Sequence, residues 1–460
     1  MSGGDLVALA ERGLAHARGE ALVTVTHERS LLSRFARSRP TQATDVDELS
    51  VEVTCVREGR LATAGAVGID DAALRDAAGR AAGAAEAAAR AGPGSYPGLP
   101  GPDQDHRPHD GWDPETAELD PGRAGAALQA AFDVAAGAGA EAFGTWTAGA
   151  VRTAIAASTG LHGVDGLTDA YAKAICRDDR RRSGFAAAAT TRAADLDMRS
   201  LAERAAARLR PAEEPAELPP GDYDVVLDAD AVGALLEFLG LLAFNGLAHA
   251  EGRGALAGRL GTRVAAAGVN LSDSPRLART LPRAFDAEGV AKAPRPLIQD
   301  GVALNVVHDI ASAAVAGDGA RSTGHALAPG GGLSGPVPTN LVLAGGGAAS
   351  VEELAAPIER GIYVTRLRYV NAVDPKHTLL TGMTRDGTFL IEDGRIARPL
   401  RDVRFTDSVL RLLDGTEALG AHPRLVTEGE FYGRRFASGV LCPPLRARDW
   451  RVTGATPGGA

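Results

Sequence analysis

Lysine, cysteine and aromatic residues are scarce in this chain of 460 residues. Only 4% of the residues are aromatic, whereas alanine and glycine are abundant, so the core must use many small side chains, which favours close packing of the backbone. Only three lysines occur and no GxxxxGK(S/T) motif is present, so neither a P-loop nor a Schiff-base lysine is expected. The three cysteines, Cys55, Cys176 and Cys442, are odd in number and widely spaced, which is not the pattern of a disulfide framework. A reducing compartment therefore fits the sequence best.

Long apolar runs and an excess of positive charge are missing as well. No stretch of about 18 apolar residues exists for a membrane helix, and Met1 to Asp5 lack the basic and apolar regions of a signal peptide. The formal net charge of -9 disfavours nucleic acid, whose phosphates need a concentrated basic surface. The sequence predicts a cytoplasmic protein with no nucleic acid and no membrane partner.

The elements that are present divide the chain into three predicted units. Residues 1–91 are expected to form an N-terminal α+β unit and residues 115–210 a second one, joined by a connection rich in proline and glycine. Each unit reads as a helix, two antiparallel hairpins and a helix, which indicates an internal duplication. A proline-rich linker over 211–220 precedes the third unit, residues 221–460, which has a long helix after the linker and then many short strands. We predict an α+β fold.

Local patterns set the expected bounds of these elements. Helices are predicted over 6–17, 70–90, 121–136, 195–210 and 230–249. Strands in the first two units are predicted over 21–28, 30–37, 49–57, 60–68, 141–147, 150–158, 167–176 and 183–191. Strands in the third unit are predicted over 223–227, 362–370, 378–383 and 388–392. Arg385 and Asp386, between the last two of these, are expected in a hairpin turn.

Motifs alone show no catalytic centre. His27 and His308 are each followed by an acid but by no second histidine at the HExxH spacing that zinc peptidases use. No GxSxG elbow occurs, so a hydrolase of that class is unsupported. Residues 330–335 formally match GxGxxG, but prolines rather than a helix follow, which indicates a loop. Cys442 has no evident histidine partner and is expected to be structural.

Segments of the third unit resemble a known family. They are residues 361–374 (GIYVTRLRYVNAVD), 378–394 (TLLTGMTRDGTFLIEDG), 321–325 (RSTGH), 338–346 (PTNLVLAGG) and 403–410 (VRFTDSVL). Together they closely resemble the signature stretch of the TldD/PmbA family, and the first half of the chain matches that family more loosely.

The resemblance implies two related subunits, a catalytic TldD-like one and a non-catalytic TldE/PmbA-like one. The catalytic kind carries HExxxH on the helix after the linker and a later cysteine ligand. This chain has Phe244 and Asn245 at the place of the first histidine and the glutamate, and only His249 remains. Phenylalanine has no lone pair for a metal, an asparagine amide is no carboxylate base, and one histidine cannot hold Zn²⁺.

These three residues therefore form a degenerate metal motif. We expect no catalytic residue, no metal and no cofactor in this chain, and we expect zinc in the partner subunit. Cys442 would replace a small residue of the inactive branch rather than serve as the metal cysteine. The chain is thereby placed with the TldE/PmbA-like branch.

The resemblance also implies a hetero-oligomer with a TldD-like catalytic subunit, acting on unfolded, leader-bearing or carrier-linked peptides. A peptide would lie as an added β-strand in a chamber between the subunits, bound through main-chain hydrogen bonds. Residues 361–370 and 378–391 are expected to shape that chamber or its dimer wall. The residues selected for peptide or partner contact are Tyr363, Arg366, Arg368, Tyr369 and Asn371.

Two other functions stay open from the sequence. One is a stand-alone metallopeptidase whose non-standard metal site is built from His249, His308, His325 or Cys442. The other is a homodimeric peptide-binding protein without a hydrolytic partner. Metal content separates the first from a non-catalytic subunit, and co-purification with a TldD-like chain argues against the second.

Overall fold

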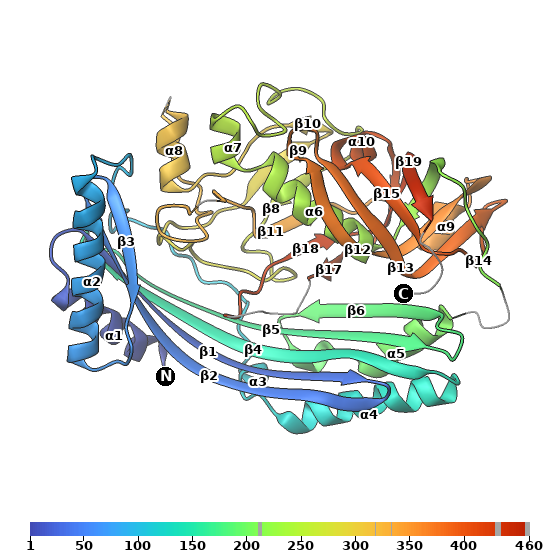
Figure 1. The fold of residues 1–460 in the computed structure, drawn as a ribbon, viewed down its shortest axis with the longest axis horizontal. Coiled ribbons are helices and arrows are strands. Elements are labelled where there is room, and N and C mark those ends of the chain that lie inside the picture. Colours follow the sequence, from blue (N-terminus) through green and yellow to red (C-terminus); the bar gives the residue numbers. More distant parts are fainter. Residues whose placement is uncertain (210–213, 318, 333, 428–433, 456–460) are drawn as a thin grey trace.

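A long curved sheet from the first half of the chain lies beneath a C-terminal part with many short strands (Figure 1). The structure is a computed structural model, and it describes residues 1–209, 214–317, 319–332, 334–427 and 434–455. The predicted α+β class is confirmed. Among the described residues, no helix combines the length and the apolar character that crossing a membrane requires. Parts of three predictions lie outside the described residues: the end of the helix over 195–210, the start of the linker over 211–220, and Leu333 of the glycine-rich segment.

The first sheet has six strands in the order β3-β2-β1-β4-β5-β6. A helix, three strands and a helix occur twice along the chain, and β1 and β4 pair antiparallel where the two repeats meet. The elements of the first repeat are α1 (Gly3–His16), β1 (Ala21–Ala36), β2 (Arg39–Arg57), β3 (Arg60–Gly65) and α2 (Asp71–Arg90). Those of the second are α4 (Pro121–Gly137), β4 (Glu141–Ala157), β5 (His162–Arg177), β6 (Ser183–Thr190) and α5 (Met198–Ala207), preceded by the short α3 (Pro114–Ala117).

The strands of this sheet are longer and fewer than the sequence predicted. The predicted pair 21–28 and 30–37 is the single strand β1, and the pair 141–147 and 150–158 is the single strand β4. The predicted gaps at residue 29 and at residues 148–149 are not interruptions of the strands. Next to them, Glu28 and Gly149 are accommodated because the C-terminal part covers this region of the sheet.

Both helix pairs cover the same face of the sheet. Val23 and Val25 of β1 pack with α1 and α2, whereas Leu31 and Phe35 of the same strand pack with α4 and α5. Alternate residues of a strand point to one face, and all four positions are odd-numbered, so both pairs lie on that face. The even-numbered positions face the C-terminal part. Alanines on these helices, which have little side chain to bury, allow the close approach to the sheet that the composition predicted.

The C-terminal part contains two further sheets. One has the order β10-β9-β8-β11-β18-β17, and the other is a ring in which β12, β7, β19, β15 and β13 pair in turn and β13 pairs again with β12. The strands of the first are β8 (Leu271–Asp273), β9 (Arg295–Gln299), β10 (Val302–Ala303), β11 (Asn340–Leu343), β17 (Arg424–Val426) and β18 (Gly439–Cys442). The ring consists of β7 (Gly221–Leu227), β12 (Arg360–Asp374), β13 (Leu379–Glu392), β15 (Val403–Ser408) and β19 (Leu445–Ala455), with β14 (Arg395–Pro399) and β16 (Thr416–Leu419) attached. The helices are α6 (Ala229–Ala243), α7 (Gly246–Ala250), α8 (Ile310–Ala316), α9 (Val351–Ala355) and α10 (Val409–Asp414).

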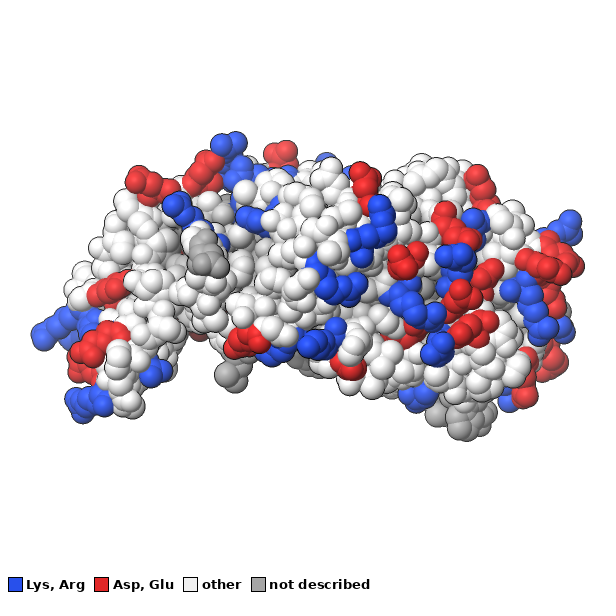
Figure 2. Space-filling view, turned by 90° about the horizontal axis from the view of Figure 1, so that it is seen from above, with Lys and Arg blue, Asp and Glu red and all other residues white. Residues whose placement is uncertain are grey.

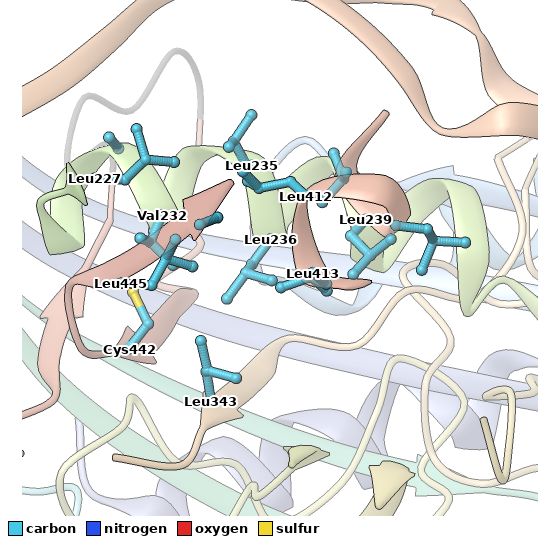
Figure 3. Close-up of a cluster of buried hydrophobic side chains, with 14 of the residues drawn as sticks. Leu227, Val232, Leu235, Leu236, Leu239, Leu343, Leu412, Leu413, Cys442 and Leu445 are labelled. Atoms are coloured by element: carbon cyan, nitrogen blue, oxygen red, sulfur yellow. The ribbon is translucent and has the colours of Figure 1, made fainter. Parts of the chain in front are cut away.

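The apolar helix α6 lies at the centre of the largest core cluster (Figure 3). Leu235, Leu236 and Leu239 of this helix pack beside Leu412 and Leu413 of α10. Such burial of several leucines is worth about 2 kcal/mol for each side chain. The helix predicted over 230–249 is wrong as one element, because it ends at Ala243 and a separate short helix, α7, follows.

The hairpin turn predicted at Arg385 and Asp386 is also wrong. Both residues lie inside β13, which runs without interruption through the two segments predicted as separate strands. The positive φ angles of Asp386 (55°) and Gly387 (133°) produce an irregularity in the pairing with β12 rather than a chain reversal. The turn signal in Arg385-Asp386-Gly387 marks a β-bulge.

A buried arginine joins the C-terminal part to the first sheet. Arg435 donates from Nε and Nη2 to the carboxylate oxygens of Asp169, each at 2.7 Å, and from Nη1 to Thr147 Oγ1 at 2.9 Å. Its backbone N–H donates to Glu28 Oε2 at 2.7 Å. The side chains of Arg435 and Asp169 are only 2% and 6% exposed. A Cβ at position 149 would lie 2.3 Å from Arg435 Nε, so Gly149 makes room for the guanidinium.

Arg435→Ala is expected to destabilise the chain by about 3–5 kcal/mol, because it leaves the Asp169 carboxylate buried without its partner. The measurement is urea unfolding followed by circular dichroism. Arg434→Ala is the matched control, since Arg434 and its partner Glu52 are 47% and 37% exposed and such a pair is worth about 0–1 kcal/mol. Equal losses for the two neighbouring variants would contradict the assignment.

Candidate functional site

The degenerate motif lies at the break between α6 and α7. Phe244 is fully buried in the core at the C-terminal end of α6. Asn245 caps α7: its Oδ1 accepts from the Ala248 N–H at 3.0 Å, and its Nδ2 donates to the Ser334 carbonyl at 2.5 Å. Asn245 is 2% exposed, so both ends of its amide are used for structure. The two positions that resemble catalytic ones are occupied by a core side chain and a helix cap.

His249 is the one potential metal ligand of the motif, and it lies beside His308. Its Nδ1 is buried and has no hydrogen-bond partner among the described residues, and burial lowers its pKa. Burial likewise lowers the pKa of His308, with a smaller lowering from the neighbouring His249. His308 packs directly against Gly246, where a Cβ would lie 2.4 Å from the His308 Nδ1. Both imidazoles are therefore favoured in the neutral form.

The other residues considered for a non-standard metal site lie elsewhere. Cys442 is fully buried and its Sγ lies 3.4 Å from the carbonyl of Ala229, at the start of α6 (Figure 3). The 15 residues of α6 span about 22 Å, so Cys442 lies at the opposite end of this helix from the α6–α7 break, which His249 follows. Burial raises the pKa of the Cys442 thiol, which disfavours the thiolate that metals bind. Within the described part of the chain, no three His, Cys, Asp or Glu side chains gather in a way that fits a metal ion.

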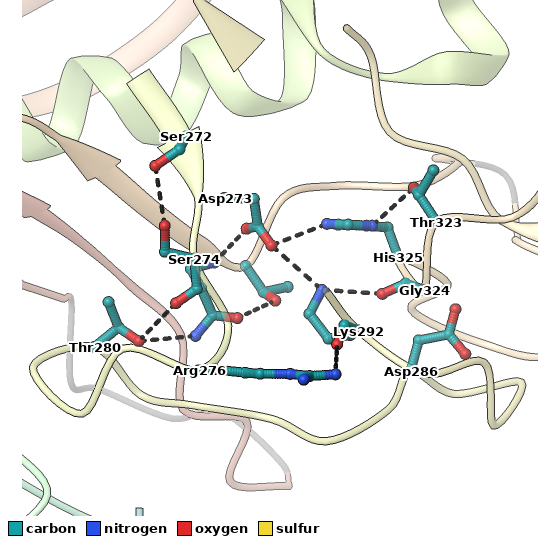
Figure 4. A network of polar contacts seen from close by, with 12 residues as sticks. Ser272, Asp273, Ser274, Arg276, Thr280, Asp286, Lys292, Thr323, Gly324 and His325 are labelled. Carbon is teal, nitrogen blue, oxygen red and sulfur yellow. Dashed lines mark hydrogen bonds and ion pairs between the residues drawn. The ribbon is translucent and has the colours of Figure 1, made fainter. Parts of the chain in front are cut away.

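His325 belongs to a buried polar network that the sequence reasoning missed (Figure 4). Asp273 Oδ2 lies 3.0 Å from His325 Nε2 and 3.6 Å from Lys292 Nζ, and its Oδ1 accepts from the Asn340 N–H. Lys292 Nζ donates to the Gly324 carbonyl at 2.9 Å. Burial, together with the Lys292 charge, lowers the pKa of His325 to about 4, so it is neutral at pH 7. The signal that could have revealed this network is Lys292, a rare lysine placed between two alanines.

Thr323, His325 and Asp273 form a chain of contacts that superficially resembles a nucleophile, base and acid. Thr323 Oγ1 lies 2.9 Å from His325 Nδ1. The same hydroxyl accepts from the His308 N–H at 2.8 Å and lies 3.1 Å from the His308 carbonyl. The Thr323 hydroxyl is thus already hydrogen-bonded to the backbone of His308, and His325 is only 1% exposed. This arrangement holds the irregular segment together rather than presenting a nucleophile.

Two carboxyl groups next to this network have raised pKa values, so they keep their protons to a higher pH than an exposed carboxyl does. Burial raises the pKa of Asp286 to about 6, against hydrogen bonds from backbone N–H groups that lower it. Burial and the nearby Asp286 raise the pKa of Glu288 to about 8, with a further contribution from Asp309. Glu288 accepts from the N–H groups of Ile310 and Gly330, so it fastens the start of α8 to the glycine-rich segment.

The residues selected for peptide or partner contact divide into two groups. Tyr363 is buried, and its hydroxyl donates to Asp228 Oδ2 at 3.1 Å. Arg366 forms an ion pair with Asp386, and its guanidinium lies 4.2 Å from the centre of the Phe185 ring of β6. These two side chains are engaged inside the chain. Arg368, Tyr369 and Asn371 lie together on an exposed stretch of β12, where Tyr369 is 67% exposed. Contact by these three with a peptide or partner stays a prediction.

Surface charge gives no single dominant field on the face that Figure 2 shows. Lysine and arginine are intermixed with aspartate and glutamate across that face, seen from above the C-terminal part (Figure 2). Intermixed charges are typical of a solvated surface and create no continuous basic track of the kind that phosphate backbones need.

Comparisons with known proteins relate the C-terminal half of the chain to one family. Residues 220–454 match the PmbA/TldA metallopeptidase C-terminal domain. A metalloprotease of Methanothermobacter thermautotrophicus is 30% identical over 221 residues, which are 48% of this chain and 47% of that protein. The chain therefore spans about half the length of this relative.

Solved structures resemble the chain over nearly its full length. TldE from Thermococcus kodakarensis has a TM-score of 0.83 at 19% identity, covering 98% of this chain and 100% of that one. A putative modulator of a DNA gyrase from Thermotoga maritima also has a TM-score of 0.83, at 20% identity over 97% and 99%. A further one from Bacteroides thetaiotaomicron has 0.76 at 18% identity over 98% of each chain. At these identities the likeness shows the fold alone.

The raised carboxyl pKa values predict that stability falls as pH rises. A folded-state pKa above the unfolded one stabilises at low pH, and this contribution is lost as pH rises through the folded value. Between pH 6 and pH 8, the titration of Glu288 is therefore expected to lower the free energy of unfolding by up to about 1.4 kcal/mol per pH unit. Urea unfolding at each pH measures this slope.

Glu288→Gln isolates the effect, because the amide does not titrate. Its slope over this window is expected to be smaller than that of the parent chain, while Glu203→Gln on the exposed face of α5 keeps the parent slope. An unchanged slope in Glu288→Gln would show that this carboxyl is already ionised throughout the window.

Proposed function

The chain belongs to the PmbA/TldD family of metallopeptidases, and from this premise we propose that it is the non-catalytic subunit of a two-component zinc enzyme. A TldD-like subunit would supply the metal and the chemistry. The observation that carries the proposal is the pair Phe244 and Asn245, whose side chains serve as core packing and as a helix cap. Neither is available for a metal or for general-base work.

The donors near this position do not fit a hydrolytic zinc. Such a site uses three protein ligands and keeps a fourth position for water. His249 and His308 are the only imidazoles at the α6–α7 break among the described residues, and neither has a carboxylate or thiolate placed to complete a set. We therefore assign this chain no step in peptide-bond cleavage.

The substrates proposed are unfolded, leader-bearing or carrier-linked peptides, processed in the cytoplasm. The chain would contribute a wall of the peptide chamber, with the exposed end of β12 toward the partner. An extended peptide is recognised largely through its main chain, which tolerates varied sequences. Support comes from the fold, which matches TldE of Thermococcus kodakarensis over the whole chain, and from the metalloprotease relative that matches about half its length.

Metal analysis of the isolated chain and of the complex tests this proposal. The chain is co-expressed with a TldD-like subunit, and each is also purified alone. We expect about one zinc per catalytic subunit, none retained by this chain alone, and peptide cleavage only when the catalytic subunit is present. His249→Ala is expected to leave the activity of the complex within about twofold, because one imidazole does not make a zinc site.

Two results would contradict the proposal. Tight zinc and peptide cleavage by this chain alone would favour the stand-alone metallopeptidase. Stable self-association and peptide binding, with no affinity for a TldD-like subunit, would favour the homodimeric peptide-binding protein. Circular dichroism of His249→Ala establishes that any loss of activity is not a loss of folding.

Arg368→Glu is expected to weaken assembly with the catalytic subunit or to lower peptide turnover by about tenfold, since its side chain is exposed beside Tyr369. Arg395→Glu on β14 makes the same charge change at another exposed position and serves as the control. Assembly is measured by analytical ultracentrifugation and turnover with a quenched fluorescent peptide. Unchanged values for Arg368→Glu would remove this end of β12 from the interface.

A further inference from the structure

A groove of about 300 Å³ follows the outer edge of β6, where the first sheet meets the C-terminal part. One wall is the backbone and the small side chains of residues 187–191, and apolar contact comes from Leu425 and Leu441. β6 is the last strand of its sheet and pairs only with β5. Figure 1 shows β6 as the strand of the first sheet that lies closest to β17 and β18. We call this the β6 groove.

Three arginines from three different elements line the β6 groove. They are Arg204 of α5, Arg279 of the segment between β8 and β9, and Arg424 of β17. Convergence of guanidinium groups from separate elements is not required by any one helix or strand. It is instead the arrangement by which proteins bind carboxylates and phosphates.

Only one of these arginines has its charge neutralised by carboxylates. Arg424 Nη2 lies 3.0 Å from Asp228 Oδ1 and 3.0 Å from Asp230 Oδ2. Arg204 Nη2 donates to the Ala187 carbonyl at 3.4 Å, and Arg279 Nη2 donates to the Pro423 carbonyl. Within the described part of the chain, neither Arg204 nor Arg279 has a carboxylate partner.

Positive charge is therefore in excess around the groove. Asp228 is shared between Arg424 and Arg208, whose Nη2 lies 2.7 Å from Asp228 Oδ2. Partial burial lowers the pKa of Arg204, and the neighbouring Arg424 and Arg208 lower it further, whereas Asp230 and Asp228 raise it. A guanidinium nevertheless stays charged at neutral pH, so the crowding is relieved by an added anion rather than by loss of a proton.

We propose that the β6 groove binds a carboxylate group of an acidic peptide between Arg204 and Arg279. The groove volume is near the lower limit for small-ligand sites and accommodates a short stretch of chain rather than a large ring system. Alanines at 187–189 keep the strand edge uncluttered, and apolar Leu425 and Leu441 suit the aliphatic part of a side chain. The carboxylate belongs either to an Asp or Glu side chain or to the peptide C-terminus.

This inference goes beyond the proposed function, because the site is complete within this chain and involves neither the zinc nor the end of β12. Its failure would leave the subunit assignment untouched, since metal content decides that assignment. Conversely, a chain that proved to hold its own zinc would still keep this arginine-lined groove.

The test is peptide binding to the purified full chain, measured by fluorescence anisotropy with an uncharged fluorophore at low salt. Three otherwise identical peptides are compared: one with an internal Glu and an amidated C-terminus, one with Gln and a free C-terminus, and one with Gln and an amidated C-terminus. We expect at least one carboxylate peptide to bind about tenfold tighter than the neutral peptide. The tighter one identifies the source of the carboxylate.

Variants locate the binding. Arg204→Gln and Arg279→Gln are each expected to weaken the preferred peptide by about fivefold to tenfold and to leave the neutral peptide unaffected. Arg75→Gln, on the exposed side of α2 in the other repeat, is the control and keeps parent affinity. Thermal unfolding verifies that all three variants are folded. Equal binding of all three peptides by the parent chain, or discrimination that survives in both groove variants, would overturn the proposal.

Discussion

The position of Arg435 against the first sheet is the constraint on which the arrangement of the two halves depends. Its guanidinium and backbone N–H together engage Asp169, Thr147 and Glu28, which come from three neighbouring strands. A charge this deeply buried is tolerated only in one geometry, because any displacement leaves both it and Asp169 unsatisfied. The contact therefore determines where the C-terminal part sits on the concave face. The alanine-rich helices occupy the opposite face and do not compete for that surface.

The long irregular segment between β8 and β11 is held in place by buried polar side chains. Residues without regular secondary structure leave part of their backbone groups without a backbone partner, and side chains supply the missing hydrogen bonds. Asp273, Asp286 and Glu288 accept hydrogen bonds from backbone N–H groups of distant residues, and Lys292 donates to a carbonyl. The carboxyl and amino groups that make these hydrogen bonds are buried with the segment, and their burial explains why strongly shifted pKa values gather there. The shifted pKa values of these carboxyl groups therefore reflect a structural role.

The degenerate motif is likewise held by specific structural contacts. Residues that merely replaced metal ligands would not have to pack or form hydrogen bonds at these two positions. Instead Phe244 fills the core, and Asn245 ends one helix and begins the next. The chain breaks between α6 and α7 at this point, and the Asn245 side chain stabilises the start of α7 as its N-cap. Both side chains therefore have specific structural roles at this break.

The sequence by itself determined the α+β class, the repeated helix–strand–helix order, and the absence of metal donors at Phe244 and Asn245, because these follow from local patterns and residue chemistry. The gaps predicted at residue 29 and at residues 148–149 were wrong, and the break in the helix after Ala243 was missed, since distant segments decide whether an element is interrupted. Only the tertiary structure showed that Tyr363 and Arg366 point into the protein and that Cys442 lies away from His249. It also brought Arg204, Arg279 and Arg424 to one groove. Contacts between residues far apart in the chain leave no periodic signal, so no reading of neighbouring residues recovers them.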